Sequence, residues 1–320
     1  MSVALCTYNG ERFVGEQIAS IAEQDERPFE LVVCDDGSTD ATVPKVRQAL
    51  ESVGSPERWR VATVTREGGV TANFARAIGL CSGDLIALCD QDDKWRAPRL
   101  AAATAILTNP EVPHLCFSNA TLIDGDGVAG QGSLFRAIQL RRAEVRQIRR
   151  GRAMRVLIRR NVVTGATATV TRSLARAAAP FPSSWLHDEW LAIIAAAIGT
   201  VTVLDGELIE YRLHATNQVG VADPGVVARA RRALGARGDR YVRLAARSED
   251  LVGRLEELGA PASALRLARA KARFEAARAR YPARRLRRIV PIASQALMGR
   301  YARLSSQRNL DIFRDLFQPL

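Results

Sequence analysis

The stretch Asp84-Leu85-Ile86-Ala87-Leu88-Cys89-Asp90-Gln91-Asp92-Asp93 decides the fold. A short apolar run ends there in three carboxylates within four residues, which predicts a buried strand with an acidic end. Ligands bind at the carboxyl ends of strands in an open α/β sheet. Carboxylates this close repel one another unless a cation neutralises them, and oxygen ligands favour Mg²⁺ or Mn²⁺. The stretch therefore predicts a metal site that also binds a phosphorylated substrate; the alternative is a solvated acidic turn.

The composition is that of a folded protein. The chain has 320 residues, of which 47% are hydrophobic and 25% charged, so it can bury a large core. No apolar run is long enough to cross a bilayer, and the first residues lack the basic flank of a signal peptide. The five cysteines are scattered without a metal-binding spacing. This pattern predicts reduced thiols in a cytoplasmic protein.

The net charge of +12 is unevenly distributed along the chain. Residues 221–320 hold 22 Lys and Arg against 9 Asp and Glu, whereas residues 1–220 are close to neutral. We therefore predict a catalytic domain over residues 1–220 and a basic, helical C-terminal region over residues 221–320.

Strands and helices alternate in the N-terminal part of the chain. Apolar runs predict strands over residues 2–7, 29–34 and 59–65 before the strand that ends at Asp90, with a helix between each pair. This order predicts an α/β fold with a doubly wound, mostly parallel sheet. The loops after the first, second and fourth strands then meet at one rim.

The polar residues of that rim have two interpretations each. Asp35 and Asp36 can accept hydrogen bonds from a base or a ribose, or they can cap the next helix. Gly68-Gly69 can let a ligand approach the backbone closely, or it can form a simple turn. The phosphate-binding loop of ATPases and the Gly-rich fingerprint of NAD-binding proteins are both absent from the sequence.

Four motifs, taken together and in order, resemble the nucleotide-sugar half of family 2 glycosyltransferases. They are Cys6-Thr7-Tyr8-Asn9-Gly10, Asp35-Asp36-Gly37-Ser38-Thr39-Asp40, Asn73-Phe74 and Asp90-Gln91-Asp92-Asp93-Lys94-Trp95. The resemblance implies a GT-A fold, a Rossmann-like sheet with flanking helices, here followed by the helical region. It implies a nucleotide-sugar half over about residues 1–95 and an acceptor half over about residues 96–220. The last motif is most similar to the rhamnosyltransferase-like branch.

The same resemblance assigns residues to donor binding. Asp92 and Asp90 would hold Mg²⁺ or Mn²⁺ against the diphosphate, and His214 would reach the metal or the diphosphate. Arg212 would neutralise phosphate charge. The residues expected to contact the nucleotide-sugar are Thr7, Tyr8, Asn9, Asp35, Asp36, Arg66, Asn73, Asp90, Gln91, Asp93, Gly165 and Arg212.

Two of these assignments have plain structural alternatives. Gly165 lies in an apolar run over residues 162–167, which also suits a core strand with a bulge. His214 follows Tyr211-Arg212 and precedes Asn217, but a lone histidine is commonly a packed or surface residue.

Trp185-Leu186-His187-Asp188-Glu189-Trp190 opens an apolar helix. Acidic residues stabilise a helix N-terminus, which is one interpretation of this segment. A carboxylate beside two tryptophans and a histidine also suits a general base, and the segment resembles the acidic pair or His-Asp motif of the family. We predict that Asp188 takes a proton from the acceptor hydroxyl, with Glu189 as the second choice. His187 would orient the carboxylate or contact the acceptor.

Arginine is concentrated in two further segments. Residues 140–160 form either a solvated helix face or a surface for an anionic acceptor such as a lipid diphosphate. In the C-terminal region Pro261, Pro282 and Pro291 are expected to separate helices. The basic face between residues 266 and 288 suits an anionic membrane surface, or is simply solvated. Nucleic acid is a disfavoured partner, because aromatic residues are few and no nucleic-acid-binding motif is present.

The predicted function is an inverting, metal-dependent sugar transfer from a dTDP-, UDP- or GDP-linked donor to a hydroxyl of a glycan or lipid-linked acceptor. The branch likeness favours rhamnose. The expected location is the cytoplasm, including the inner face of the membrane. A nucleotidyltransferase is one alternative, although the loop after the first strand carries no Lys or Arg. The other is a non-catalytic basic protein that binds membrane or nucleic acid and needs neither Asp92 nor Asp188.

Overall fold

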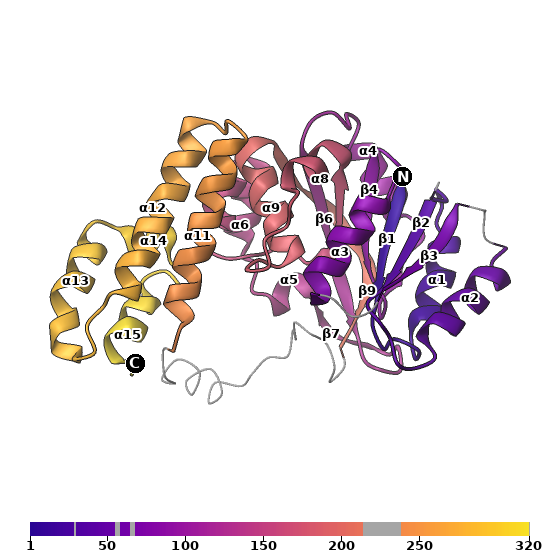
Figure 1. Ribbon diagram of the computed structural model, residues 1–320, viewed down its shortest axis with the longest axis horizontal. Helices are drawn as coiled ribbons and strands as arrows, with labels where there is room; N and C mark the ends of the chain where they lie inside the picture. The colour runs from indigo at the N-terminus through magenta and orange to yellow at the C-terminus, as the bar shows by residue number, and fades with distance from the viewer. Residues whose placement is uncertain (29, 55–57, 65–67, 214–237, 320) are drawn as a thin grey trace. The chain divides into compact units, whose positions relative to one another are not determined.

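The computed structural model describes residues 1–28, 30–54, 58–64, 68–213 and 238–319 (Figure 1). The chain forms two compact units. One comprises residues 1–151 with 162–222, and the other comprises residues 152–161 with 223–320.

The first unit contains, within its described residues, a nine-stranded mixed sheet. Its strands are β1 (Ser2–Thr7), β2 (Glu30–Asp35), β3 (Trp59–Thr63), β4 (Leu85–Asp90), β5 (Lys94–Trp95), β6 (His114–Ile123), β7 (Ala129–Ser133), β8 (Ala168–Thr171) and β9 (Thr200–Arg212). The strand order is β3-β2-β1-β4-β8-β6-β9-β5, with β7 paired to β6. The first four strands of this order are parallel, and β8 runs antiparallel to both of its neighbours. This is the expected α/β fold.

Helices cover both faces of the sheet (Figure 1). The helical elements of this unit are α1 (Val14–Ala22), α2 (Thr42–Ser52), α3 (Gly69–Leu80), α4 (Arg99–Ile106), α5 (Leu134–Ala137), α6 (Arg142–Arg149), the 3₁₀ turn η1 (Gly165–Thr167), α8 (Arg172–Ala178) and α9 (His187–Ile198). Val3 and Leu5 of β1 pack against Val14 and Ile18 of α1. Because side chains alternate along a strand, the other face of β1 is left to α3. Every residue of β1 and β2 is buried, as parallel strands covered on both faces should be.

Most of the expected elements are confirmed, and one is not. The strands beginning at Ser2 and Leu85 and the helix opened by the Trp185–Trp190 segment are present. The apolar run before Thr167 is not a strand, because Gly165–Thr167 forms a 3₁₀ turn and β8 begins only at Ala168. All five cysteines are buried free thiols. Among the described helices, none combines the length and apolarity needed to cross a bilayer.

The second unit is helical. Its described helices are α7 (Ala153–Leu157), α11 (Arg240–Glu257), α12 (Ala262–Ala279), α13 (Arg285–Leu297), α14 (Arg300–Leu304) and α15 (Leu310–Phe317). Pro261 and Pro282 separate helices as predicted. The prediction for Pro291 is wrong, since it lies inside α13. Proline removes one helical hydrogen bond there, and the burial of Arg288 and Ile292 on either side keeps the helix continuous.

A charge network is buried in the second unit. The carboxylate of Asp315 accepts hydrogen bonds from Tyr241 Oη (2.6 Å), Tyr301 Oη (2.6 Å) and Arg278 Nε (2.7 Å). Arg278 Nη1 also donates to Glu275 Oε2 at 3.1 Å. Buried charges are tolerated only when they are paired in this way.

The network corrects the prediction of one exposed basic face between residues 266 and 288. Lys271 Nζ donates to Glu275 Oε1 at 2.7 Å, and both side chains lie inside the unit. Arg288 is fully buried and donates to backbone carbonyls, including that of Gln318 at 2.6 Å. With Arg278 also internal, three of the predicted surface cations hold the unit together instead.

Candidate active site

The carboxyl ends of β1, β2 and β4 lie side by side. The strand register pairs Thr7 with Asp35 and Cys6 with Asp90. Thr7 Oγ1 donates a hydrogen bond to Asp35 Oδ1 at 2.8 Å. Three of the residues predicted to bind the donor are thereby brought together at the rim where ligands bind in sheets of this kind.

The loops after β1 and β4 are joined by a reciprocal pair of hydrogen bonds. The Tyr8 backbone N–H donates to Gln91 Oε1 (2.8 Å), and Gln91 Nε2 donates to the Tyr8 carbonyl (3.0 Å). A Cβ atom on Gly10 would lie 2.1 Å from Gln91 Oε1, so only glycine allows this approach. Asn9, in the left-handed region at φ 48°, accepts a bond from the Thr39 N–H at 2.9 Å. The three loops therefore form one braced rim.

Three of the residues predicted to contact the donor brace this rim. Asp35 Oδ2 accepts from the Ser38 backbone N–H at 2.8 Å. Asn73 Nδ2 donates to the Cys34 carbonyl at 2.9 Å. Asp36 is buried next to Asp35, and its N–H donates to the Thr7 carbonyl at 3.0 Å. These bonds set the shape of the loop after β2, as a binding rim requires.

The acidic end of β4 concentrates negative charge in a buried place. Burial, followed by the charges of Asp92 and Asp188, raises the pKa of Asp90 to about 8. Burial and the charges of Asp92 and Asp90 also raise the pKa of Asp93. Asp93 is almost fully buried, and its Oδ2 has no hydrogen-bond partner within the part of the chain that the structure describes. A buried, mutually repelling set of carboxylates is the environment that a divalent cation stabilises.

The oxygen ligands fit Mg²⁺ or Mn²⁺ in number and kind. Within the described residues, no group of three His, Cys, Asp or Glu side chains could hold a metal by itself. Mg²⁺ commonly takes one or two carboxylates and completes its shell with substrate phosphates, so Asp90 and Asp92 are sufficient. The predicted metal ligand His214 and the predicted nucleotide contact Arg66 lie outside the described residues.

The start of α9 faces this acidic end. The turn η1 packs against β4, and the charge of Asp188 contributes to the raised pKa of Asp90. Asp188 Oδ2 accepts from the Gly165 backbone N–H at 3.1 Å. A Cβ atom on Gly165 would lie 2.6 Å from His187 Nε2, so η1 packs against α9 only because residue 165 is glycine. The predicted residues Gly165, His187 and Asp188 form one cluster.

The helix is held in place by its flanking aromatic residues. The His187 ring stacks on Phe74 of α3, with the ring centres 3.8 Å apart. Trp190 Nε1 donates to the Ala178 carbonyl at 2.7 Å, and Thr71 Oγ1 donates to the Trp185 carbonyl at 3.0 Å. Asp188 and Glu189 lie in the first turn, where the helix dipole favours negative charge. The Glu189 N–H donates to Asp188 Oδ1 at 2.6 Å, so both Asp188 oxygens are oriented by backbone donors.

His187 is a neutral group in this structure. Burial lowers the pKa of His187 to about 3. Neither ring nitrogen has a hydrogen-bond partner among the described residues, although the side chain is buried. A neutral imidazole can donate one bond and accept one, so His187 suits contact with a sugar hydroxyl and does not supply charge.

Arg212 makes several contacts within the protein at the acidic loop. Its guanidinium is buried, donates to Glu16 Oε2 at 2.6 Å and to the Asp92 carbonyl at 2.8 Å, and stacks over Phe13. Its backbone N–H donates to Asp93 Oδ1 at 3.0 Å. These contacts hold the acidic loop in shape. The contact between Arg212 and a phosphate stays a prediction.

The comparison with known families agrees with this geometry. The family described as Glycosyl transferase family 2 matches residues 2–165, just over half of the chain. The chain belongs to glycosyl transferase family 2.

Two curated relatives of this family 2 chain show how much of each protein the similarity covers. Uncharacterized protein Rv1520 of Mycobacterium tuberculosis is 27% identical over 218 residues, which are 67% of this chain and 59% of the relative. The Escherichia coli protein WfgD, a UDP-Glc:alpha-D-GlcNAc-diphosphoundecaprenol beta-1,3-glucosyltransferase, is 29% identical over 41% of this chain and 49% of its own length. The chain thus spans about half to three-fifths of these relatives.

Solved structures share the fold of this family 2 chain. Staphylococcus aureus TarS 1–349 in complex with UDP-GlcNAc superposes with a TM-score of 0.56 at 18% identity, covering 99% of this chain and 90% of the other. The mannosyltransferase PcManGT of Pyrobaculum calidifontis, in complex with GDP-Man and Mn²⁺, gives a TM-score of 0.51 at 19% identity, covering 98% and 85%. At these identities the likeness shows the fold alone.

One residue of the family 2 site was missed by the sequence analysis. Arg99 of α4 is buried over the Trp95 ring, 3.4 Å from its centre. Its Nη2 donates to the carbonyls of Leu88 (3.0 Å) and Ala166 (2.8 Å), so it ties β4 to the turn that carries Gly165. The available signal was a single arginine on the apolar face of a short helix, next to Leu100 and four residues before Ala103.

Proposed function

We propose that the chain is a glycosyltransferase that moves a sugar from a nucleotide-diphosphate sugar to a hydroxyl of a glycan or lipid-linked acceptor. One observation carries the proposal: Asp188, the candidate base, accepts a hydrogen bond from Gly165 of η1, and Arg99 ties that turn to β4, the strand whose end carries Asp90. Family membership and the lipid-linked acceptor that WfgD's name states support it. The proposed location is the cytoplasm, because the five free thiols suit a reducing compartment.

The donor diphosphate is expected at the braced rim. Asp92 and Asp90 would hold Mg²⁺ or Mn²⁺, which stabilises the negative charge that develops on the leaving nucleoside diphosphate. Thr7, Tyr8 and Gln91 border the position of the nucleoside. Arg212 and Asp93 keep the acidic loop in one conformation, so the carboxylates are oriented before the donor arrives.

The acceptor chemistry is expected at the start of α9. The acceptor oxygen loses its proton to Asp188 and forms a bond to the anomeric carbon, while the bond from that carbon to the diphosphate oxygen breaks. Attack from the side opposite the diphosphate inverts the anomeric centre. Both Asp188 oxygens accept a backbone N–H, from Gly165 and from Glu189, which orients the carboxylate. His187 would bond a hydroxyl of the bound sugar or acceptor.

We propose both the chemical class of the donor and the sugar that it carries. The chemical class is a nucleotide-diphosphate sugar, with dTDP, UDP and GDP all to be tested. Rhamnose stays the predicted sugar on the strength of the Asp-Gln-Asp-Asp-x-Trp motif at residues 90–95. The solved neighbours were obtained with UDP-GlcNAc and GDP-Man, so those donors belong in the same panel.

The test is a panel of dTDP-, UDP- and GDP-sugars with Mn²⁺ or Mg²⁺, measured by thermal shift and by release of the nucleoside diphosphate. We expect at least one donor to stabilise the protein only when the metal is present. Asp92→Asn should lose both the stabilisation and the release. Asp188→Asn should keep donor binding and slow the transfer on the order of a thousandfold, the usual contribution of a general base.

Asp205→Asn is the matched control, because its side chain is 93% exposed on β9 and pairs with an exposed arginine, Arg149. It should behave as the wild type. Absence of stabilisation by every donor, or full activity of both active-site variants, would contradict the proposal and favour the non-catalytic alternative.

A further inference from the structure

Helix α15 has its polar and apolar sides reversed for a protein surface in water. Its two aspartates, Asp311 and Asp315, are buried. Leu310, Phe313 and Phe317 lie on the opposite side with 66%, 63% and 48% of their surface exposed. The buried cation Arg278 accounts for the inward aspartates. It does not account for an outward stripe of large apolar residues.

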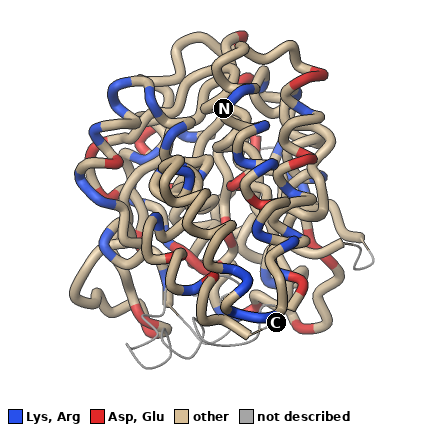
Figure 2. Tube along the Cα trace, turned by 90° about the vertical axis from the view of Figure 1, so that its left-hand side faces the viewer, with Lys and Arg blue, Asp and Glu red and all other residues tan. Residues whose placement is uncertain are grey.

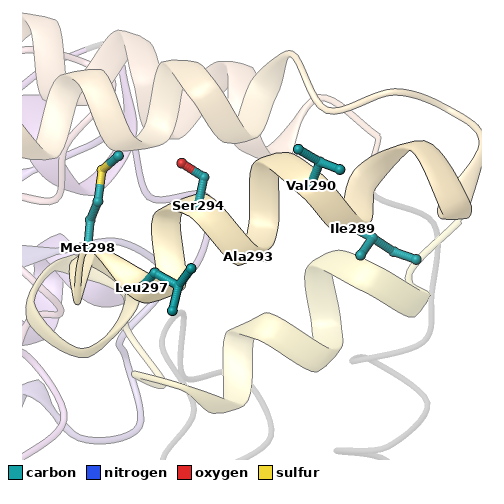
Figure 3. A pocket seen from close by; sticks show the side chains of 6 residues that line it. All are labelled: Ile289, Val290, Ala293, Ser294, Leu297 and Met298. Atoms are coloured by element: carbon teal, nitrogen blue, oxygen red, sulfur yellow. The ribbon is translucent and has the colours of Figure 1, made fainter.

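Helix α13 repeats the reversal. Arg288 is fully buried, whereas Leu286, Val290 and Leu297 are 81%, 76% and 90% exposed. These positions are four and seven residues apart, so they lie on one side of the helix. A shallow apolar groove runs along this helix (Figure 3). It is lined by Ile289, Val290, Ala293, Ser294, Leu297 and Met298.

The charges around the two helices are of one sign. Arg284, Arg285, Arg287 and Arg303 are exposed. The acidic residues between 281 and 319, all of which are described, are Asp311 and Asp315, and both are buried. Figure 2 shows basic segments beside the marked C-terminus. The surface of residues 281–319 therefore offers cations and apolar side chains without an aspartate or glutamate.

We propose that α13 and α15 form a docking surface for an anionic lipid bilayer. The docking surface consists of Leu286, Ile289, Val290, Leu297, Phe313 and Phe317, with Arg284, Arg285 and Arg287. Apolar residues on one side of a helix with arginines beside them are the pattern of helices that lie in the membrane interface. Arginines near the surface are attracted to anionic headgroups. This proposal does not depend on the proposed catalytic activity.

Charge favours a bilayer over a second copy of the chain. Two docking surfaces pressed together would place arginines against arginines without a carboxylate to separate them, which opposes association. An anionic bilayer supplies both complements, namely phosphate groups for the arginines and acyl chains for the apolar side chains. Arg288 fixes the geometry, since it bonds the Asp315 and Gln318 carbonyls and so ties α13 to the end of α15.

Vesicle co-sedimentation of the full chain tests the proposal. We expect binding to phosphatidylcholine vesicles that contain phosphatidylglycerol and little binding to phosphatidylcholine alone. The variant F313S/F317S should weaken binding to the mixed vesicles at least about tenfold, because each large apolar side chain contributes by burial. The variant R284Q/R285Q/R287Q should weaken it by roughly fivefold for each arginine, and high salt should reproduce that loss.

Val242→Ser is the matched control, because Val242 is 60% exposed on α11 in the same unit. It should bind as the wild type does. Failure of the wild-type chain to bind mixed vesicles, or wild-type binding by both docking-surface variants, would overturn the proposal. Self-association that F313S/F317S abolishes, without vesicle binding, would show instead that a second copy covers the surface.

A spectroscopic probe separates docking from misfolding of the variants. Phe313→Trp keeps an aromatic side chain at an exposed position, so the unit should fold normally. The emission of the introduced tryptophan should shift to shorter wavelength and be quenched by brominated lipids in mixed vesicles. Val242→Trp should show neither change. If the tryptophan introduced on α15 stayed unquenched in vesicle-bound protein, insertion of α15 would be ruled out and with it the proposed surface.

Discussion

Carboxylates gather in both units of the protein, and their surroundings differ in one respect. At the end of β4, burial and the neighbouring carboxylates raise the pKa values of Asp90 and Asp93. In the second unit burial also acts to raise the pKa of Asp311, but the charge of Arg278 and a hydrogen bond from Ser305 outweigh it, so the pKa is lowered. In the Asp311 cluster the cation outweighs burial, whereas at the end of β4 the charge of Arg99 lowers the pKa of Asp93 less than burial and the neighbouring carboxylates raise it.

This difference distinguishes carboxylates that stabilise the fold from carboxylates that suit the binding of a metal ion. A buried acid with a built-in arginine is part of the fold, and removing it leaves the arginine uncompensated. A buried acid whose neighbouring cations do not offset its burial is held in an unfavourable state that a bound cation relieves. Mutations that neutralise a carboxylate should therefore change stability in opposite directions in the two units.

The largest effect on stability is expected from Asp315→Asn. The substitution removes the charge that Arg278 Nε and Nη2 bond at 2.7 and 2.9 Å. Breaking a buried ion pair costs about 3–5 kcal/mol. Because Glu275 still contacts Arg278 in the variant, we expect the free energy of unfolding to fall by about 3 kcal/mol. Urea unfolding followed by circular dichroism measures it, and hydrogen exchange of the α15 amides localises it.

The exposed pair of Arg269 and Glu256, 2.7 Å apart in the same unit, supplies the control. Glu256→Gln should cost less than about 1 kcal/mol, as surface ion pairs do. Equal effects of the two substitutions would mean that the Asp315 network is not a stabilising element.

This comparison also marks what the sequence could and could not predict. The acidic end of β4 was predictable because an apolar run followed by aspartates is a local pattern. The rim was predictable because parallel strands bring their carboxyl ends to one edge, so Thr7, Asp35 and Asp90 had to meet. Both inferences use only neighbouring residues and strand order.

Pairing between distant residues was not predictable. Arg278 and Arg288 have the sequence pattern of a solvated basic face, but Arg278 pairs with Asp315, 37 residues further on. Glu16, which accepts from Arg212, is 196 residues away, so the sequence alone could not reveal this ion pair. The sequence shows which residues carry charge, but it does not show which of these side chains become buried.

The second prediction is a gain in the free energy of unfolding, whereas the first is a loss. Asp90→Asn should stabilise the metal-free protein, because it removes a carboxylate whose charged form is disfavoured in the fold. The folded-state pKa of about 8 lies above the unfolded value of about 3.9. The destabilising effect is therefore absent below about pH 4, grows as the pH rises, and is complete above about pH 8.

Thermal unfolding at pH 5 and pH 9 without metal measures this prediction. The variant should gain on the order of 1–3 kcal/mol over the wild type at pH 9 and much less at pH 5. A second readout uses the wild type: stabilisation by Mn²⁺ with a nucleoside diphosphate should increase from pH 5 to pH 8, because the ion competes with the proton on Asp90. A variant that is less stable than wild type at pH 9 would contradict the comparison.

The smallest effect is expected at the contact between η1 and α9. Gly165→Ala places a methyl group 2.6 Å from His187 Nε2, so the His187 ring must move, while the 3.5 Å distance to Asp188 Cβ is an ordinary contact. Overpacking of this kind costs about 1–3 kcal/mol. Since Gly165 N–H also orients Asp188, the transfer rate should fall roughly tenfold, less than the loss from Asp188→Asn, with little change in donor KM.

The neighbouring substitution Ala166→Gly is the control, because it leaves the Gly165 N–H and the His187 contact in place. It should alter stability slightly and leave the rate nearly unchanged. If Gly165→Ala instead raised the donor KM and spared kcat, Gly165 would belong to the diphosphate site, as the family resemblance first implied, and the orientation of Asp188 would have to rest on the Glu189 N–H alone.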